Sequence, residues 1–222
     1  MKEIVDNFNT IASLLPEKAW DKDTFWVIRI IGRKKDNPEL SKNSKFYKAY
    51  TVQSRSELLD LRDKIVECAL QNGARAYFNP NARSWRKVAL STLKRIADYI
   101  SCENYPAVQF AADRCLDEGA APGYTKIWVI DLDEQKQEEV TKSILKRMSV
   151  PVIAEVPTLH GKHLLTHPFN PNDMWDRWHY DVERPEIKKN NPTLLYYNRI
   201  WDDNQDEFLI ENYGPNYENL NL

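Results

Sequence analysis

Lys126-Ile127-Trp128-Val129-Ile130-Asp131-Leu132-Asp133-Glu134 is the stretch around which the rest of this chain is organised. Apolar and β-favouring residues lead directly into two aspartates, which predicts a strand that ends at its carboxylates. Because side chains alternate between the faces of a strand, Asp131 and Asp133 are expected on one face and Leu132 in the core. Two carboxylates on one face repel each other unless a cation lies between them, and a divalent metal is the obvious candidate. The simpler alternative is a strand that stops at a polar turn, where Asp is common.

The composition is that of a globular protein with one large domain or two small ones. The chain has 222 residues, 42% of them hydrophobic and 29% charged, which is enough to bury a core. Its formal net charge is −2, so nucleic acid binding would need a local basic patch. The three cysteines form no C-x-x-C pair and indicate neither a disulfide framework nor a zinc module. Without a long apolar run or a signal peptide, we expect no membrane partner and a cytoplasmic, reducing location.

Two strands near the N-terminus predict a β-hairpin. Residues 25–31 and 46–52 are rich in aromatic and β-branched side chains, and a charged segment separates them. The tip, Arg33-Lys34-Lys35, is most simply a solvated turn, and its alternative is a contact with a nucleic-acid backbone. Helices are expected on both sides, over residues 4–15 and, from a capping box, over residues 54–72.

Downstream of the hairpin, predicted strands and helices alternate. Strands are expected at 74–78, 126–133, 151–156, 162–167 and 193–197, helices at 84–99, 106–118, 135–148 and 172–178, and a polar loop at 181–191. Strand, helix and strand at this spacing are typical of a crossover unit or of the helix-bearing half of a ferredoxin-like sheet. We therefore expect an α/β (α+β) fold, a two-layer domain around a mixed sheet. A helical and hairpin part, residues 1–73, would pack against a core of residues 74–197 in a single domain of residues 1–222. The acidic, Asn-rich tail, residues 198–222, is expected to be a peripheral wrap or partly disordered.

Three of the four histidines of the chain lie within eight residues, at positions 160, 163 and 167. Gly161 predicts a tight turn, and in the strand after it His163 and Leu165 would share one face. The simpler interpretation is a chance cluster of surface histidines. Their alternating directions do not suit a zinc site.

An Asp-x-Asp strand followed about thirty residues later by a Gly-x-His strand suits metal-dependent phosphate chemistry. Asp131 and Asp133 would hold one or two divalent cations, Mg²⁺ or Mn²⁺, which neutralise and orient a triphosphate. His163 would donate a hydrogen bond to a phosphate oxygen, and Lys162 or Arg83 would add positive charge. A glycosyltransferase Asp-x-Asp is an alternative that leaves the histidine strand unexplained.

Together these motifs resemble the catalytic core of the archaeo-eukaryotic primase superfamily, the primase-polymerases often carried by phages and plasmids. The family's hydrophobic strand ending in Asp-x-Asp is matched by Trp128-Val129-Ile130-Asp131-Leu132-Asp133. Its histidine strand, introduced by a small or Gly-containing turn, is matched by Thr158-Leu159-His160-Gly161-Lys162-His163-Leu164. The resemblance covers roughly residues 74–197 and implies an RRM-like, primase-type core. It implies that Asp131, Asp133 and His163 are catalytic, with Thr158, Gly161, Lys162 and Arg83 near the substrate.

The function that the resemblance implies is a nucleotidyltransferase that joins NTPs or dNTPs on a single-stranded or primed nucleic acid with Mg²⁺ or Mn²⁺. Replication proteins are candidate partners, and the location is the host cytoplasm if a phage encodes the chain. Two alternatives stay open: a non-catalytic nucleotide- or nucleic-acid-binding descendant used in phage replication or host takeover, and a metal-dependent nuclease or phosphohydrolase. The family's third motif, a hydrophobic residue followed by Asp on a later strand, has no clear counterpart. The strand at 193–197 runs into Asn198, and Asp181 and Asp202 are candidate substitutes.

Overall fold

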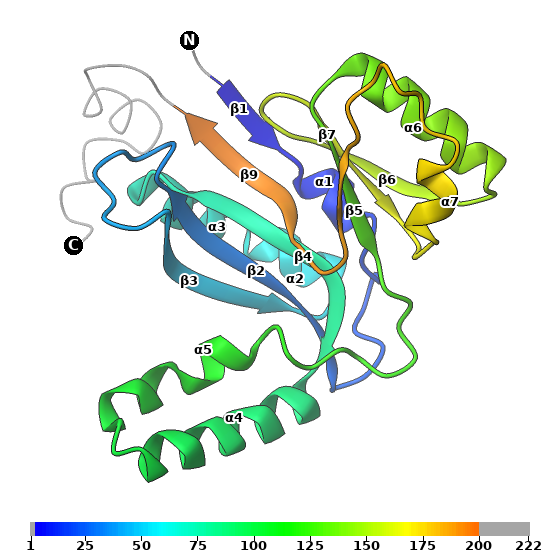
Figure 1. The fold of residues 1–222 in the computed structure, drawn as a ribbon. Helices are drawn as coiled ribbons and strands as arrows, with labels where there is room; N and C mark the ends of the chain where they lie inside the picture. The colour runs from blue at the N-terminus through cyan, green and yellow to red at the C-terminus, as the bar shows by residue number, and fades with distance from the viewer. Residues whose placement is uncertain (1–2, 200–222) are drawn as a thin grey trace.

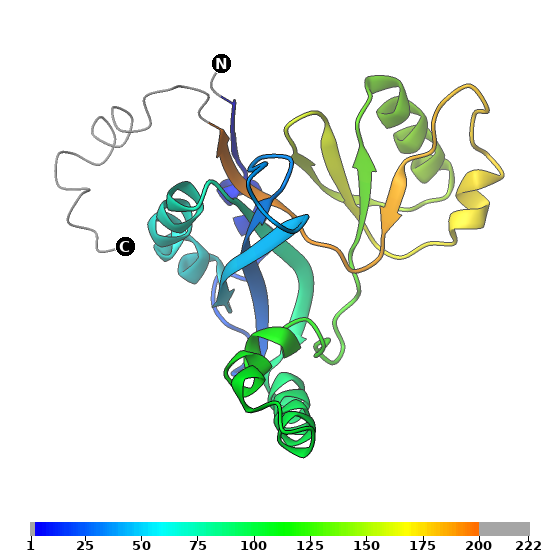
Figure 2. The same ribbon diagram turned by 60° about the vertical axis from the view of Figure 1, so that its left-hand side comes forward.

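Two antiparallel β-sheets lie side by side in the computed structural model, which describes residues 3–199 (Figures 1 and 2). The first sheet has the strand order β1 (Glu3–Asp6), β9 (Thr193–Arg199), β4 (Arg75–Ser84), β2 (Thr24–Arg33) and β3 (Ser44–Val52). The second has the order β6 (Val152–Pro157), β7 (Lys162–Thr166), β5 (Trp128–Leu132) and β8 (Glu186–Lys188). The mixed α and β character is as predicted. The prediction of a single mixed sheet is wrong, because there are two sheets and every strand pair among the described residues is antiparallel.

The first sheet takes strands from both of the parts into which we divided the chain. β4 and β9 come from the predicted core, residues 74–197, yet they pair with β2 and β1. Residues 3–6 form β1 instead of the first turn of a helix, because their backbone groups find partners in β9. Only α1 (Phe8–Ala12) remains of the helix predicted there. Long-range pairing has overridden the local pattern.

The predicted β2–β3 hairpin is confirmed, and it is held from one side by helices. Ile28 and Ile30 of β2 are buried in one cluster with Ile65 and Ala69 of α3 (Arg62–Gln71). Figure 1 shows α2 (Arg55–Asp60) and α3 behind this sheet. The capping serine is confirmed, since Ser54 Oγ accepts a hydrogen bond from the Glu57 N–H at 3.3 Å. The single helix predicted over residues 54–72 is two helices, divided at Leu61.

Strand β4 is longer than predicted, because residues 79–81 do not form the expected turn. The Asn81 side chain bonds both backbone groups of Ile127, donating to its C=O at 2.9 Å and accepting from its N–H at 2.8 Å. The β2–β4 register shifts at this point, between Phe25 and Val27. Such a bulge tolerates Pro80, which has no N–H for the ladder.

A helical hairpin projects from the end of β4. It consists of α4 (Trp85–Ser101), a 3₁₀ helix (Tyr105–Phe110) and α5 (Ala111–Cys115), near the predicted positions. Ser84 caps α4 by accepting a hydrogen bond from the Lys87 N–H at 3.2 Å. Figures 1 and 2 show the hairpin standing away from the second sheet, below the edge formed by β2 and β3.

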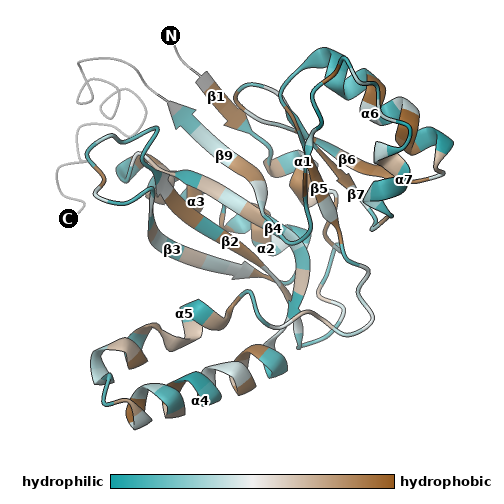
Figure 3. Cartoon of the chain, in the orientation of Figure 1, coloured by the Kyte–Doolittle hydropathy of each residue, from teal (hydrophilic) through white to brown (hydrophobic). Residues whose placement is uncertain are grey.

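The second sheet follows the chain order β5, α6 (Gln135–Arg147), β6, β7, α7 (Pro171–Trp175), β8. Its two faces follow the alternation predicted from the sequence. Val129 and Leu165 face the core shared with the first sheet, whereas Ile130, Leu132 and Leu164 pack against Leu145 of α6. Figure 3 shows that β5 and β2 are largely hydrophobic and that the loop between β2 and β3 is hydrophilic.

The two sheets are joined by a buried amide. The Asn7 side chain donates hydrogen bonds to the C=O of Pro157 at 2.8 Å and to the C=O of Leu194 at 2.9 Å. These carbonyls belong to the end of β6 and to β9, so one side chain ties both sheets at their junction. A buried amide with both donors satisfied holds its partners in place.

No helix in residues 3–199 has the length and apolar character needed to cross a membrane. The acidic tail, for which we predicted a peripheral wrap or disorder, lies beyond Arg199 outside the described residues. Asp202 lies there too.

Candidate functional site

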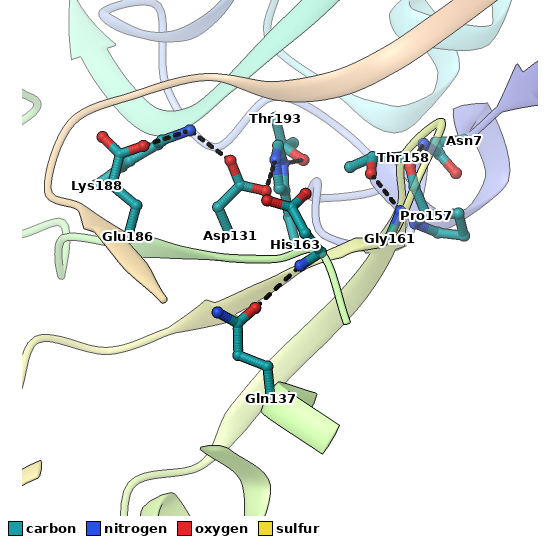
Figure 4. A network of polar contacts seen from close by, with 11 residues as sticks. Asn7, Asp131, Gln137, Pro157, Thr158, Gly161, His163, Glu186, Lys188 and Thr193 are labelled. Atoms are coloured by element: carbon teal, nitrogen blue, oxygen red, sulfur yellow. Dashed lines mark hydrogen bonds and ion pairs between the residues drawn. The ribbon is translucent and has the colours of Figure 1, made fainter. Parts of the chain in front are cut away.

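Asp131 and His163, which are 32 positions apart in the sequence, are direct cross-strand neighbours on β5 and β7. His163 Nε2 lies 3.2 Å from Asp131 Oδ1, and His163 Nδ1 lies 2.8 Å from the hydroxyl oxygen of Thr193 in β9 (Figure 4). A neutral imidazole satisfies both contacts if Nε2–H donates to the carboxylate and Nδ1 accepts from Thr193. His163 is buried, so its ring orientation is set by these two partners.

The second carboxylate oxygen of Asp131 contacts a cation from the neighbouring strand. Lys188 Nζ lies 2.6 Å from Asp131 Oδ2 and 3.2 Å from Glu186 Oε2 (Figure 4). Lys188 and Glu186 belong to β8, and both lie on the same face of the sheet as Asp131. The hydrogen bond from His163, followed by that from Lys188, lowers the pKa of Asp131 far below its usual range despite burial. Burial opposes the charge of Lys188, but the hydrogen bond to Asp131 raises its pKa overall. Both groups are therefore charged at neutral pH.

A groove of about 220 Å³ lies between the two sheets at this position. From the second sheet it receives Asp131, His163 and Lys188 together with Asp133, which lies one residue beyond β5. The first sheet and its hairpin loop contribute cations and an aromatic ring. They are Arg33, Lys35, Arg75 and Tyr77. The groove therefore brings the predicted Asp131, Asp133 and His163 together and adds a basic wall that the sequence motifs did not contain.

Gly161 and Thr158 shape the turn at the end of the groove. Thr158 Oγ1 accepts a hydrogen bond from the Gly161 N–H at 3.1 Å, and the Thr158 N–H donates to the Gly161 C=O at 2.9 Å. A Cβ on Gly161 would lie only 1.9 Å from the backbone oxygen of Leu132. The glycine therefore lets the β6–β7 turn approach the end of β5 next to Asp133, and Thr158 itself lines the groove.

Two of the predicted site residues lie elsewhere. Lys162 is on the opposite face of β7, where its Nζ contacts Glu138 of α6 at 2.9 Å and Glu155 at 3.3 Å. Arg83 is buried in β4, where its guanidinium donates to Asn190 Oδ1 at 2.9 Å, and burial lowers its pKa. Neither side chain lines the groove that contains Asp131.

The histidine cluster is divided by the fold. His160 is exposed on the β6–β7 turn and lines the groove beside His163. His167 lies past the end of β7, in a separate depression with Trp20 and Tyr124. His160 and His163 therefore share the groove, whereas His167 lies apart from it.

The donor set around Asp131 suits a hard divalent cation. Carboxylate oxygens are the ligands that Mg²⁺ and Mn²⁺ prefer, and here Asp131 and Glu186 already share one cation, the Lys188 ammonium. Within residues 3–199, no three His, Cys, Asp or Glu side chains converge closely enough to hold a metal ion. The type of donor therefore suits the predicted metal, but the side chains as placed do not form a metal site, and the Lys188 ammonium occupies the position between the two carboxylates.

Sequence reasoning missed β8 and with it Glu186 and Lys188. The segment 181–191 was predicted to be a polar loop, and the third carboxylate was sought at Asp181, at Asp202 and after the strand at 193–197. Asp181 is exposed and pairs with Lys136 of α6 at 2.6 Å, away from the groove. Glu186 instead lies directly opposite Asp131 in the β5–β8 register. The only local signal was the alternation Glu-Ile-Lys, which is too short to distinguish a strand from a loop.

The fold and the groove define a class: an α+β protein whose acid-and-histidine site lies between two antiparallel sheets. Comparisons with protein-family models, with curated proteins and with solved structures found no match.

Proposed function

We propose that this chain is a primase-polymerase-like nucleotidyltransferase that joins NTPs or dNTPs on a nucleic-acid template with Mg²⁺ or Mn²⁺. The observation that carries the proposal is the cross-strand pair of Asp131 and His163, which opens into a groove with a basic opposite wall. A carboxylate for a metal and cations for phosphates are the two requirements of phosphoryl transfer.

The order of elements in the second sheet supports the proposal. The chain order β5-α6-β6-β7-α7-β8, with the sheet order β8-β5-β7-β6, supports a ferredoxin-like sheet, whose elements follow the order β-α-β-β-α-β. β5 and β7, which carry the Asp-x-Asp and the histidine of the primase resemblance, are the two central neighbours in this order. β8 is then the later strand of the third motif, with Glu186 in place of the family's Asp.

Each group has a role that follows from its position. Asp131, Asp133 and Glu186 would hold the metal, which supplies charge neutralisation and orientation of a triphosphate. His163, fixed by Thr193, holds the Asp131 carboxylate from one side. Arg33 and Lys35 face the groove from the other sheet and attract phosphates. Both ring nitrogens of His163 have protein partners, so its contact with a phosphate stays a prediction.

The test is incorporation of a labelled nucleotide on single-stranded DNA by the full chain with Mg²⁺ or Mn²⁺. We expect extension that is abolished by a chelator. Breakdown of the DNA or of the nucleotide in the same reaction would favour the nuclease or phosphohydrolase alternative and contradict the proposal.

One contact favours a second candidate, a descendant of the primase fold that binds nucleotide or nucleic acid without turnover. The Lys188 ammonium neutralises Asp131 at the position that a catalytic cation would share. A protein that has replaced its metal with a lysine would still attract phosphates. This candidate predicts nucleotide or DNA binding that is insensitive to a chelator, together with no incorporation.

Lys188→Met tests whether a metal binds at Asp131. We expect the variant to bind Mn²⁺ at least about tenfold more tightly than the wild type, because an ammonium 2.6 Å from the carboxylate no longer competes with the ion. Calorimetric titration measures the affinity, and Lys136→Met, which removes an exposed partner of Asp181, is the matched control. Equal Mn²⁺ affinity in the wild type and in Lys188→Met would show that the metal is not bound at Asp131.

A further inference from the structure

The face of the first sheet opposite α2 and α3 is left open between α5 and the groove. At one end this face is covered, because Phe25 and Val27 of β2 pack against Val88 of α4 and Cys115 of α5. At the other end Ile31 and Arg33 of β2 line the groove. Arg29, between these ends, lies opposite Tyr77 of β4, and Ile31 at the groove end lies opposite Phe46 of β3. Directly paired residues point to the same face, so the open area carries two aromatic rings and two arginines.

The aromatic side chains of this face are accessible. Phe46 is 41% exposed on an outer strand, and the Arg29 guanidinium lies 5.5 Å from its ring centroid. Tyr77 is partly exposed and lines the groove itself. The Arg29 guanidinium is itself engaged, because it pairs with Asp117 at 2.8 Å and donates to the C=O of Asp113 in α5 at 3.2 Å. An accessible aromatic ring on an open sheet face is a surface on which unpaired bases stack. The distribution of charge around these rings indicates which occupant the face would take.

The hairpin tip beside these rings carries cations without an ion-pair partner within residues 3–199. Arg33 and Lys35 form no ion pair with any of the described residues, although both reach the groove. The acid that follows them in the sequence, Asp36, is turned inward and binds Arg75 through two hydrogen bonds of 2.7 and 2.6 Å, with its side chain only 2% exposed. The tip Arg33-Lys34-Lys35 therefore presents its positive charge to solvent in a chain whose net charge is −2.

We propose that this open face binds single-stranded nucleic acid and leads it into the groove. Bases stack on Phe46 and Tyr77, and phosphates lie against Arg33 and Lys35. The use of the strand as a template rests on the proposed function, whereas the binding itself does not require turnover. Charge complementarity selects a polyanion, and accessible rings in line with the groove select unpaired bases over a duplex.

The experiment measures the affinity of the full chain for a fluorescent oligo(dT) by anisotropy over a range of salt concentrations. We expect Phe46→Ala to weaken binding about tenfold, and Phe46→Leu, which keeps a hydrophobic side chain, to weaken it similarly because stacking is lost. In the double variant Arg33→Gln/Lys35→Gln, we expect the slope of log affinity against log salt to become shallower by about 1.4, since two phosphate contacts are removed.

Matched controls come from exposed positions away from this face. Tyr180→Ala removes a fully exposed aromatic ring, and Lys146→Gln/Arg147→Gln removes two exposed charges at the end of α6. Binding of all the Phe46, Arg33 and Lys35 variants within twofold of the wild type would overturn the inference. If the wild type incorporates nucleotide while these variants bind normally, only the inference fails. If the wild type binds DNA through this face but incorporates nothing, the inference holds and the proposed function fails.

Discussion

Asp131→Asn is expected to lower nucleotide incorporation by at least about 100-fold. Loss of a residue that only supports a metal ligand costs 10–100-fold, so removing the charge of a direct ligand should cost no less. The amide retains the size of the carboxylate, and its oxygen still accepts a hydrogen bond from His163, whereas its NH₂ group replaces the oxygen that accepts from Lys188. Lys188 keeps Glu186 as a partner at 3.2 Å. The measurement is the rate of primer extension with Mn²⁺ at saturating nucleotide.

The control for this variant is Asp181→Asn, because Asp181 was the alternative carboxylate and forms an exposed pair with Lys136. We expect it to retain the wild-type rate. Thermal unfolding of both variants establishes that the fold is intact. Full activity of Asp131→Asn would remove Asp131 from the metal site, and with it the central assignment of the proposed function.

Gly161→Ala is expected to destabilise the fold by about 1–3 kcal/mol or more, the cost of forcing extra atoms into a packed interior. The added Cβ would lie 1.9 Å from the Leu132 backbone oxygen, 2.9 Å from its carbonyl carbon and 3.0 Å from Asp133 Cα. All three atoms are backbone atoms at the end of β5, so relief requires the turn and the strand to separate. Urea denaturation measures the free energy of unfolding, and the remaining folded protein is expected to lose activity because Asp133 moves.

Gly32→Ala is the matched control for this prediction. Its Cβ would lie 2.9 Å from the edge of the Tyr47 ring, a side chain that can rotate away. We therefore expect a clearly smaller loss of stability at Gly32 than at Gly161. An equal loss in the two variants would contradict the close approach of the β6–β7 turn to β5.

The parts of the candidate site that depend on local pattern were predictable. Alternation in residues 126–133 and 162–167 indicated which side chains share a face, and the structure places Asp131 and His163 on one face with Lys162 on the other. The hairpin of β2 and β3 and the capping serine at Ser54 were equally visible, because each depends on residues that are near one another in the sequence.

The parts that depend on distant partners were not predictable. β1 exists because β9 pairs with it, and β4 continues past Pro80 because Asn81 binds the backbone of Ile127. The positions of two predicted site cations also depend on distant partners. Lys162 and Arg83 were near the motifs in sequence or in expected structure, but Glu138 and Asn190 hold them elsewhere.

By itself, the sequence determined that an acid-bearing strand and a histidine-bearing strand exist and which faces they present, since strand alternation is a property of the local backbone. Only the tertiary structure decided what surrounds them. It brought Lys188 and Glu186 to Asp131 through β8, and Arg33 and Lys35 to the groove through the packing of a second sheet. These contacts join residues far apart in the chain, and no local pattern encodes a pairing whose partner lies in another sheet.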